Sequence, residues 1–249
     1  MKGAPFFVGW MAPPRGLRGF LWVVATASVL AFCAAALVTA ATQNDPGSGA
    51  FRWDWGAQTL TGTLSDGPSP ILHVEGEGRF SGRSILLSNP GKRGIGHRVD
   101  DLLGTRVRAT GIMLARGDLL MMQVRGNQTG LQPAEGVAAA PPIADLGRWR
   151  LTGEICDGKC YAGAMRPGTG LAHKACANLC IVGGVPAVFV STAPVEGATV
   201  FLLGDASGQS AAAHATRWSA ARVALSGRVE RRGGMPVFLA EFDSIAPAP

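Results

Sequence analysis

TRVRATGIMLARGDLLMMQV (residues 105–124) is the stretch that decides the fold. It begins with Arg106-Val107-Arg108-Ala109, in which polar and apolar side chains alternate. A period of two is typical of a β-strand with one buried face. Arg116-Gly117-Asp118 lies between two apolar runs and predicts a hairpin turn. The stretch therefore predicts two neighbouring antiparallel strands.

The same pattern returns later in the chain, as ARVALSGRVERRGGMPVFLAEF (residues 221–242). Three upstream segments recur in the same order: Leu60-Thr61-Gly62 matches Leu151-Thr152-Gly153, SPILHV (69–74) matches VPAVFV (185–190), and SILLSNPGKRG (84–94) matches TVFLLGDASGQ (199–209). About five strands that occur twice in one order predict a duplicated domain. We expect the two copies at 55–131 and 148–249, joined by an Ala-, Pro- and Gly-rich linker over 132–147.

The size of each copy suggests a fold. Each has about 80 to 100 residues and about five short strands with glycine at the bends, which is typical of a small, partly open Greek-key barrel of the OB type. We therefore expect a mainly β protein with two tandem OB-like barrels.

Both copies also resemble the small exported OB-like domains of bacteria. The second copy opens with G-E-I-x-D-x-x-C-Y at Gly153 and continues with H-x-x-C-A-x-x-C-I-x-G-G-x-P at His173. These motifs are similar to those of a cysteine-bearing variant in bacterial membrane-anchored exported proteins with tandem OB-like domains. The resemblance covers most of residues 55–248, and it implies a fold but no activity.

The N-terminal region predicts one transmembrane helix. Residues 19–42 contain no charged side chain, and about 20 apolar residues span a bilayer core as a helix. Three basic residues precede this segment, so the positive-inside rule places the N-terminus in the cytoplasm. We expect a single-pass inner-membrane protein with a cytoplasmic tail at 1–18, the anchor at 19–42, and a tether at 43–54 that leads to a periplasmic body.

A cleaved signal peptide is the alternative for this region, because Val38-Thr39-Ala40 resembles a small-residue cleavage site. The apolar region of a signal peptide usually has about 7 to 15 residues, which is shorter than this one. The anchor is therefore the favoured interpretation. A net charge of +6 on an exported protein indicates an anionic lipid or an acidic partner rather than nucleic acid, and aromatic residues for base stacking are sparse in the repeats.

The second copy carries an insertion that the first copy lacks, at 154–184 between the LTG strand and the next strand. It holds four of the five cysteines, as the pairs Cys156/Cys160 and Cys176/Cys180. Cysteines four apart lie on one face of a helix. HKACANLCIV (173–182) predicts such a helical turn, and Gly183-Gly184 predicts its end. We call residues 154–184 the cysteine-rich insertion.

Two disulfides are the first hypothesis for the four cysteines, because the periplasm is oxidising. Four cysteines allow three pairings, and the sequence does not choose among them. The spacing resembles the twin C-x3-C pattern of small mitochondrial chaperones. That resemblance implies that Cys156 pairs with Cys180 and that Cys160 pairs with Cys176. Closing a loop of about 15 residues stabilises a fold by about 3 kcal/mol in the chain-entropy model.

A metal site is the second hypothesis. Two cysteine pairs two to four residues apart supply the four ligands of a structural zinc site. The ligand set is then Cys156, Cys160, Cys176 and Cys180, with His173 as a fifth candidate ligand for zinc or copper. A redox-active dithiol is the third hypothesis, although the C-x-x-C spacing of thioredoxin-like proteins is absent.

The sequence lacks paired carboxylates in an acid/base setting, a nucleophile elbow and a dinucleotide fingerprint. We therefore expect a non-enzymatic, membrane-anchored periplasmic accessory protein without a cofactor. In this hypothesis a disulfide-braced loop binds a protein partner in a membrane redox or assembly complex. The alternative is a periplasmic zinc- or copper-binding protein, or a thiol-redox protein, that uses the four cysteines and His173.

Overall fold

The computed structural model of this chain describes residues 13–42 and 47–248. The chain divides into two compact units, residues 1–45 and 46–249. Parts of the expected tail (1–18) and tether (43–54) lie outside the described residues.

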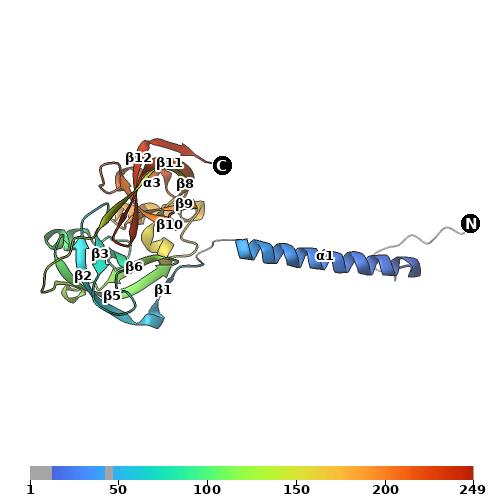
Figure 1. The fold of residues 1–249 in the computed structure, drawn as a ribbon, viewed down its shortest axis with the longest axis horizontal. Coiled ribbons are helices and arrows are strands. Elements are labelled where there is room, and N and C mark those ends of the chain that lie inside the picture. The colour runs from blue at the N-terminus through green and yellow to red at the C-terminus, as the bar shows by residue number, and fades with distance from the viewer. Residues whose placement is uncertain (1–12, 43–46, 249) are drawn as a thin grey trace, which may run out of the picture. The chain divides into compact units, whose positions relative to one another are not determined.

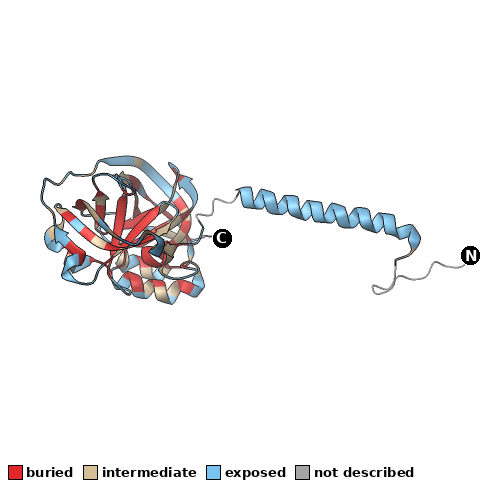
Figure 2. Cartoon of the chain, turned by 90° about the horizontal axis from the view of Figure 1, so that it is seen from below, coloured by how far each residue is buried: buried red, intermediate tan, exposed pale blue. Residues whose placement is uncertain are grey.

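The first unit contains one helix, α1 (Arg15–Thr42). Its side chains are exposed along its length, as Figure 2 shows. Among the described residues, α1 is the one helix long and apolar enough to cross a membrane, and a signal sequence near an N-terminus meets the same criteria. The expected anchor at 19–42 lies within this helix.

The second unit is mainly β and consists of two halves that lie side by side in Figure 1. The first half has seven strands: β1 (Ala50–Phe51), β2 (Ala57–Ser65), β3 (Ile71–Val74), β4 (Ser84–Ser88), β5 (Arg106–Arg116), β6 (Leu119–Val124) and β7 (Leu131–Pro133). The second half has five: β8 (Ile143–Asp157), β9 (Ala187–Val195), β10 (Ala198–Asp205), β11 (Arg222–Arg232) and β12 (Met235–Pro247). The ends of the expected linker at 132–147 thus belong to β7 and β8.

The second half is a closed barrel in the order β10-β12-β11-β8-β9. All its neighbours are antiparallel except β10 and β12, which are parallel. In the first half, β2 pairs with β3, β3 with β4, and β5 with both β2 and β6, all antiparallel. Its one parallel pair is β4 with β6. Strands that match in sequence therefore have matching partners in the two halves.

The predicted hairpin in residues 105–124 is confirmed. Arg116 pairs with Leu119 across the turn between β5 and β6. Gly117 has φ +53°, a left-handed conformation that glycine adopts without a steric penalty. The matching hairpin of the second half has Gly233 at φ +55° in the corresponding place.

Each half has its own apolar core, and a third apolar cluster joins the two halves. Leu86 and Met121 of the first half and Val188 and Leu202 of the second belong to this joining cluster and are fully buried or nearly so. Burying apolar surface contributes about 25 cal/mol per Å². The halves are therefore packed against each other within one unit.

Short helices connect the strands. They are η1 (Trp53–Trp55), η2 (Gly96–Arg98), η3 (Asp100–Leu102), η4 (Gln128–Gly130), η5 (Cys160–Ala164), η6 (Leu171–His173), α2 (Lys174–Val182) and α3 (Ala212–Trp218). Three of them, η5, η6 and α2, belong to the cysteine-rich insertion.

Candidate metal centre

The cysteine-rich insertion leaves the barrel where β8 ends at Asp157 and returns to it where β9 begins at Ala187. The Asp157 carboxylate accepts the Cys160 backbone N–H at 2.8 Å, which fixes the turn into η5. The predicted helical turn at 173–182 is confirmed as α2. Gly184, just beyond its end, has φ +84°, the left-handed conformation common after helices.

Three cysteines of the insertion converge. Cys176 and Cys180 lie one turn apart on α2, and Cys160 faces them from η5. The Cys160 Sγ is 3.8 Å from the Cys176 Sγ and 3.9 Å from the Cys180 Sγ. A tetrahedral zinc site with Zn–S bonds of about 2.3 Å has sulfur–sulfur edges of about 3.8 Å. Both distances equal this edge, and all three sulfurs lie within 4.8 Å of one another.

Cys156 does not join this group. Successive residues of a strand point to opposite faces: Ile155 belongs to the core of the second half, whereas Cys156 belongs to the cluster that joins the halves. The Cys156 thiol donates to Glu154 Oε1 at 3.3 Å. Burial raises the pKa of Cys156 well above its ordinary value, which keeps it a thiol. Cys156, a member of the predicted ligand set, thus lies outside the group of three sulfurs.

The expected disulfides are not in this structure. All the cysteines are free, and the closest sulfur pair, at 3.8 Å, is well beyond a disulfide bond of about 2.05 Å. Of the expected pair Cys156–Cys180, Cys156 packs in the apolar cluster that joins the halves, whereas Cys180 packs with Cys160 and Val185. In the pair Cys160–Cys176 the sulfurs are 3.8 Å apart, and Cys180 lies almost as close to Cys160, at 3.9 Å.

His173 and Asp157 form a buried pair beside the three sulfurs. The His173 Nε2 contacts Asp157 Oδ2 at 2.9 Å, and their side chains are 1% and 0% exposed. Ligand atoms of Asp157, Cys160 and His173 all lie within 4.8 Å of one another. His173 Nδ1 is buried and has no hydrogen-bond partner among the described residues. Leaving such an atom unsatisfied costs about 1–3 kcal/mol, so this nitrogen is suited to a ligand.

The contact between His173 and Asp157 has a form that is common beside bound metal ions. A histidine that binds a metal through one ring nitrogen usually donates the other N–H to a carboxylate. Asp157 holds Nε2 in that way, which leaves the lone pair of Nδ1 for an ion. Sequence reasoning treated His173 as a candidate ligand and missed Asp157. The available signal was its position in the strand, three residues before Cys160.

The thiols differ in how readily they ionise. A hydrogen bond from Cys160 lowers the pKa of Cys180. The same hydrogen bond is the largest cause that raises the pKa of Cys160, and burial of Cys160 is the second cause. Cys180 therefore loses its proton more readily than Cys160, and a metal ligand must be deprotonated. Binding of a cation by Cys160 would release its proton.

Two lysines connect the first half to the cysteines. Lys92, in the loop after β4, donates from Nζ to Cys176 Sγ at 2.5 Å, and this hydrogen bond raises the pKa of Lys92. Lys159, whose pKa is lowered by burial, donates from Nζ to the carbonyls of Asn89 and Gly91 at 2.6 and 2.7 Å. No sequence motif indicates this contact, because Lys92 and Cys176 are 84 residues apart.

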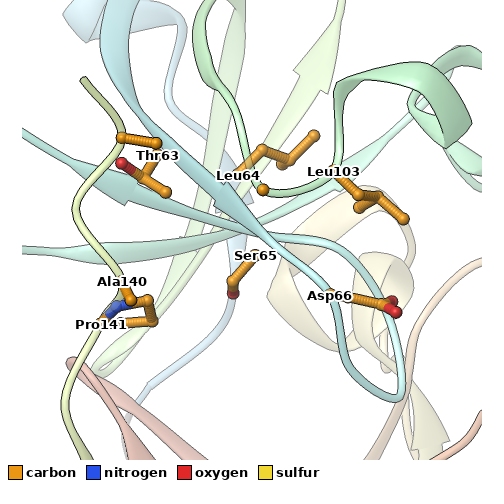
Figure 3. A pocket seen from close by; sticks show the side chains of 9 residues that line it. Thr63, Leu64, Ser65, Asp66, Leu103, Ala140 and Pro141 are labelled. Atoms are coloured by element: carbon orange, nitrogen blue, oxygen red, sulfur yellow. The ribbon is translucent and has the colours of Figure 1, made fainter.

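The first half also has a pocket of about 420 Å³, shown in Figure 3. Its lining is mostly apolar or uncharged: Thr63, Leu64, Ser65, Asp66, Leu103, Gly104, Ala138, Ala140 and Pro141. None of these residues belongs to the cysteine cluster, and the single carboxylate lacks a partner acid or base in the lining. The lining of this pocket therefore adds no residue to the candidate site in the insertion.

Because similar proteins do not indicate a function, the geometry of the cysteine cluster is the basis for the function proposed below. No family model, curated protein or solved structure matches this chain.

Proposed function

We propose that this protein is a membrane-anchored periplasmic metal-binding protein, with Cys160, Cys176, Cys180 and His173 as the ligands of one zinc or copper ion. The observation that carries the proposal is the spacing of the sulfurs, 3.8 and 3.9 Å, which equals the edge of a tetrahedral thiolate site. The unpartnered Nδ1 of buried His173 supplies the fourth donor.

The donor set favours a soft or borderline ion. Thiolate and imidazole ligands select Zn²⁺ or Cu⁺ over magnesium or calcium. Three sulfurs close together, with the buried His173 beside one of them, favour zinc, which is almost always four-coordinate in structural sites. Three thiolates and a Zn²⁺ ion carry one net negative charge, and Lys92 supplies a positive charge at Cys176. A bound ion would also protect the thiolates from oxidation in the periplasm.

The scaffold in this proposal is a pair of OB-like barrels. The second half is a closed five-stranded barrel, and its third and fifth strands, β10 and β12, are parallel. This pattern of strand pairing supports an OB-type Greek-key barrel. The equivalent pairings of the first half support a second barrel of the same type. The insertion then corresponds to an enlarged connection between the first two strands of the second barrel.

The proposed location rests on the charge around α1. Arg15 and Arg18 stand at its start, whereas no acidic residue lies before it. The positive-inside rule then orients this helix with its N-terminus in the cytoplasm and the two halves in the periplasm.

The test is the metal content of the full-length chain, purified in detergent from membranes of cells grown with zinc and copper. We expect close to one ion per chain, and its loss in Cys160→Ser and Cys180→Ser. Cys156→Ala is the matched control, because Cys156 is equally buried but lies outside the cluster. X-ray absorption should report both sulfur and nitrogen neighbours. Full metal content in Cys180→Ser, or a metal-free wild type with titratable thiols, contradicts the proposal.

A second candidate function is that of an accessory protein whose insertion binds a protein partner. Leu171, Leu179 and Val182 are 74%, 61% and 76% exposed on the insertion, and apolar side chains this exposed favour association. Residues 158–195 contain no acidic side chain, which favours an acidic partner. Leu179→Glu should remove any protein that co-purifies with the wild type from native membranes. Unchanged co-purification contradicts this function without affecting the metal site.

A further inference from the structure

The three cysteines of the cluster are not equally accessible. Cys160 and Cys180 are 4% and 1% exposed, whereas Cys176 is half-buried. His173, the fourth proposed ligand, is 2% exposed. Cys160, Cys180 and His173 would therefore shield an ion held by these residues from solvent. Its only protein ligand within reach of an incoming group is Cys176.

Cys176 also has a second partner, which the buried cysteines lack. Lys92 is exposed, and its ammonium group donates to the Cys176 sulfur at 2.5 Å. A charge-assisted hydrogen bond to a thiolate withdraws electron density that would otherwise bind the ion. This hydrogen bond weakens the bond between Cys176 and an ion.

The loop that carries Lys92 is fixed in place by the insertion itself. Lys159 binds two of its carbonyls, as described above, and the Gly94 N–H donates to the Gly183 carbonyl at 2.8 Å. A Cβ built on Gly183 would lie 2.0 Å from the Lys92 carbonyl oxygen, so the two backbones touch. The backbone contacts between the loop and the insertion therefore hold Lys92 next to Cys176, at the interface between the halves.

We propose that Cys176 is the ligand through which this site exchanges its ion, and that Lys92 promotes the exchange. The inference rests on the proposed metal-binding function. Cys176 detaches with its lone pair and is retained by the Lys92 ammonium, while Cys160, Cys180 and His173 hold the ion. A thiolate of an acceptor takes the vacated position, and further acceptor ligands then displace the buried ones. No electron is transferred in any step.

The experiment measures how fast zinc passes from the loaded, full-length protein in detergent to an excess of a chromogenic chelator, pyridylazoresorcinol. Lys92→Met keeps the length of the side chain and removes the ammonium. We expect it to bind zinc fully and to release it about tenfold more slowly, which corresponds to about 1.4 kcal/mol. Lys92→Arg retains the charge and should release zinc at nearly the wild-type rate. Arg93→Met, one residue along the same loop, is the control for loss of charge alone.

A second variant tests the role of Cys176. Cys176→Ser should still bind zinc through the three buried ligands, whereas Cys160→Ser should not. Wild-type release by Lys92→Met, or loss of its zinc, overturns the inference, as does equal loss of zinc from both cysteine variants. Failure of the wild type to bind any ion refutes the metal site itself. If the wild type binds zinc but its rate of zinc release does not depend on Lys92, only the exchange mechanism is refuted.

Discussion

The His173 imidazole and the Asp157 carboxylate face each other at 2.9 Å with both side chains almost completely buried. A buried pair of this kind is costly unless each of its polar atoms has a use. Asp157 uses one oxygen for His173 and the other for the Cys160 N–H, so it connects the histidine to the turn that carries a cysteine. The pair thereby positions two proposed ligands at once.

This relationship predicts that Asp157→Asn weakens metal binding while leaving all four ligands present. Loss of the carboxylate that orients a metal-binding histidine typically costs about 10–100-fold in affinity. Competition titration against a zinc chelator would measure the change. Asp118→Asn is the control, because Asp118 is fully exposed in the β5–β6 hairpin. An unchanged affinity in Asp157→Asn would mean that His173 is not a ligand.

Removal of the ion should destabilise the fold. A ligand at about 100 times its dissociation constant stabilises the native state by about 2.7 kcal/mol. In a chain of this size, about 1 kcal/mol changes the melting temperature by about 2–4 °C. We therefore expect chelation to lower the melting temperature of the wild type, as followed by circular dichroism. Cys180→Ser should melt at the same temperature with or without chelator, and a chelator effect of equal size in that variant would argue for a different site.

Local periodicity was sufficient to predict the strands, because each strand needs only its own alternation of polar and apolar residues. The alternation around Val107 and the turn at Gly117 are properties of short segments, and the structure has them where expected. The helical turn that carries Cys176 and Cys180 was predictable for the same reason.

The membership of the cysteine cluster was not predictable in full, because it depends on the directions in which side chains point, and residue spacing does not encode those directions. Cys156 and Cys160 have the same spacing as Cys176 and Cys180, but β8 continues through Cys156 and turns its side chain away from the cluster. Lys92 comes from the other half of the chain, so no motif in the insertion indicates it. The disulfide hypothesis depended on the oxidising compartment, which does not determine the distance between sulfurs.

His73 predicts a pH dependence of stability. Its ring lies between the hydroxyls of Ser65 and Ser84, at 2.7 and 2.9 Å, and burial lowers its pKa in the folded state. The unfolded state, with a pKa of about 6.5, then binds the proton more readily. Stability is therefore full above that pKa and falls as the pH decreases towards the folded-state pKa.

Denaturant unfolding of the wild type at about pH 7.5 and about pH 5.5, on either side of the ordinary histidine pKa, measures this loss. In His73→Gln the amide keeps hydrogen-bonding capacity without titrating, so the decrease between the two pH values should be smaller. An equal decrease in the variant would assign the pH dependence to other groups. Asp205, whose pKa is lowered by the Ser207 hydroxyl, lies in a different turn and titrates below this range.

Gly183→Ala should separate the two halves at the cysteine cluster. A Cβ at this position would lie 2.0 Å from the carbonyl oxygen of Lys92, and backbone cannot move aside as a flexible side chain can. Overpacking of this kind typically costs about 1–3 kcal/mol, and it should also displace Lys92 from Cys176. Gly96→Ala is the matched control, since nothing lies within 4 Å of its Cβ position. Gly183→Ala should change both the free energy of unfolding, measured with denaturant, and the rate of zinc release. Gly96→Ala should change neither quantity. If Gly183→Ala is as stable as the wild type, the contact between the two backbones is absent in solution.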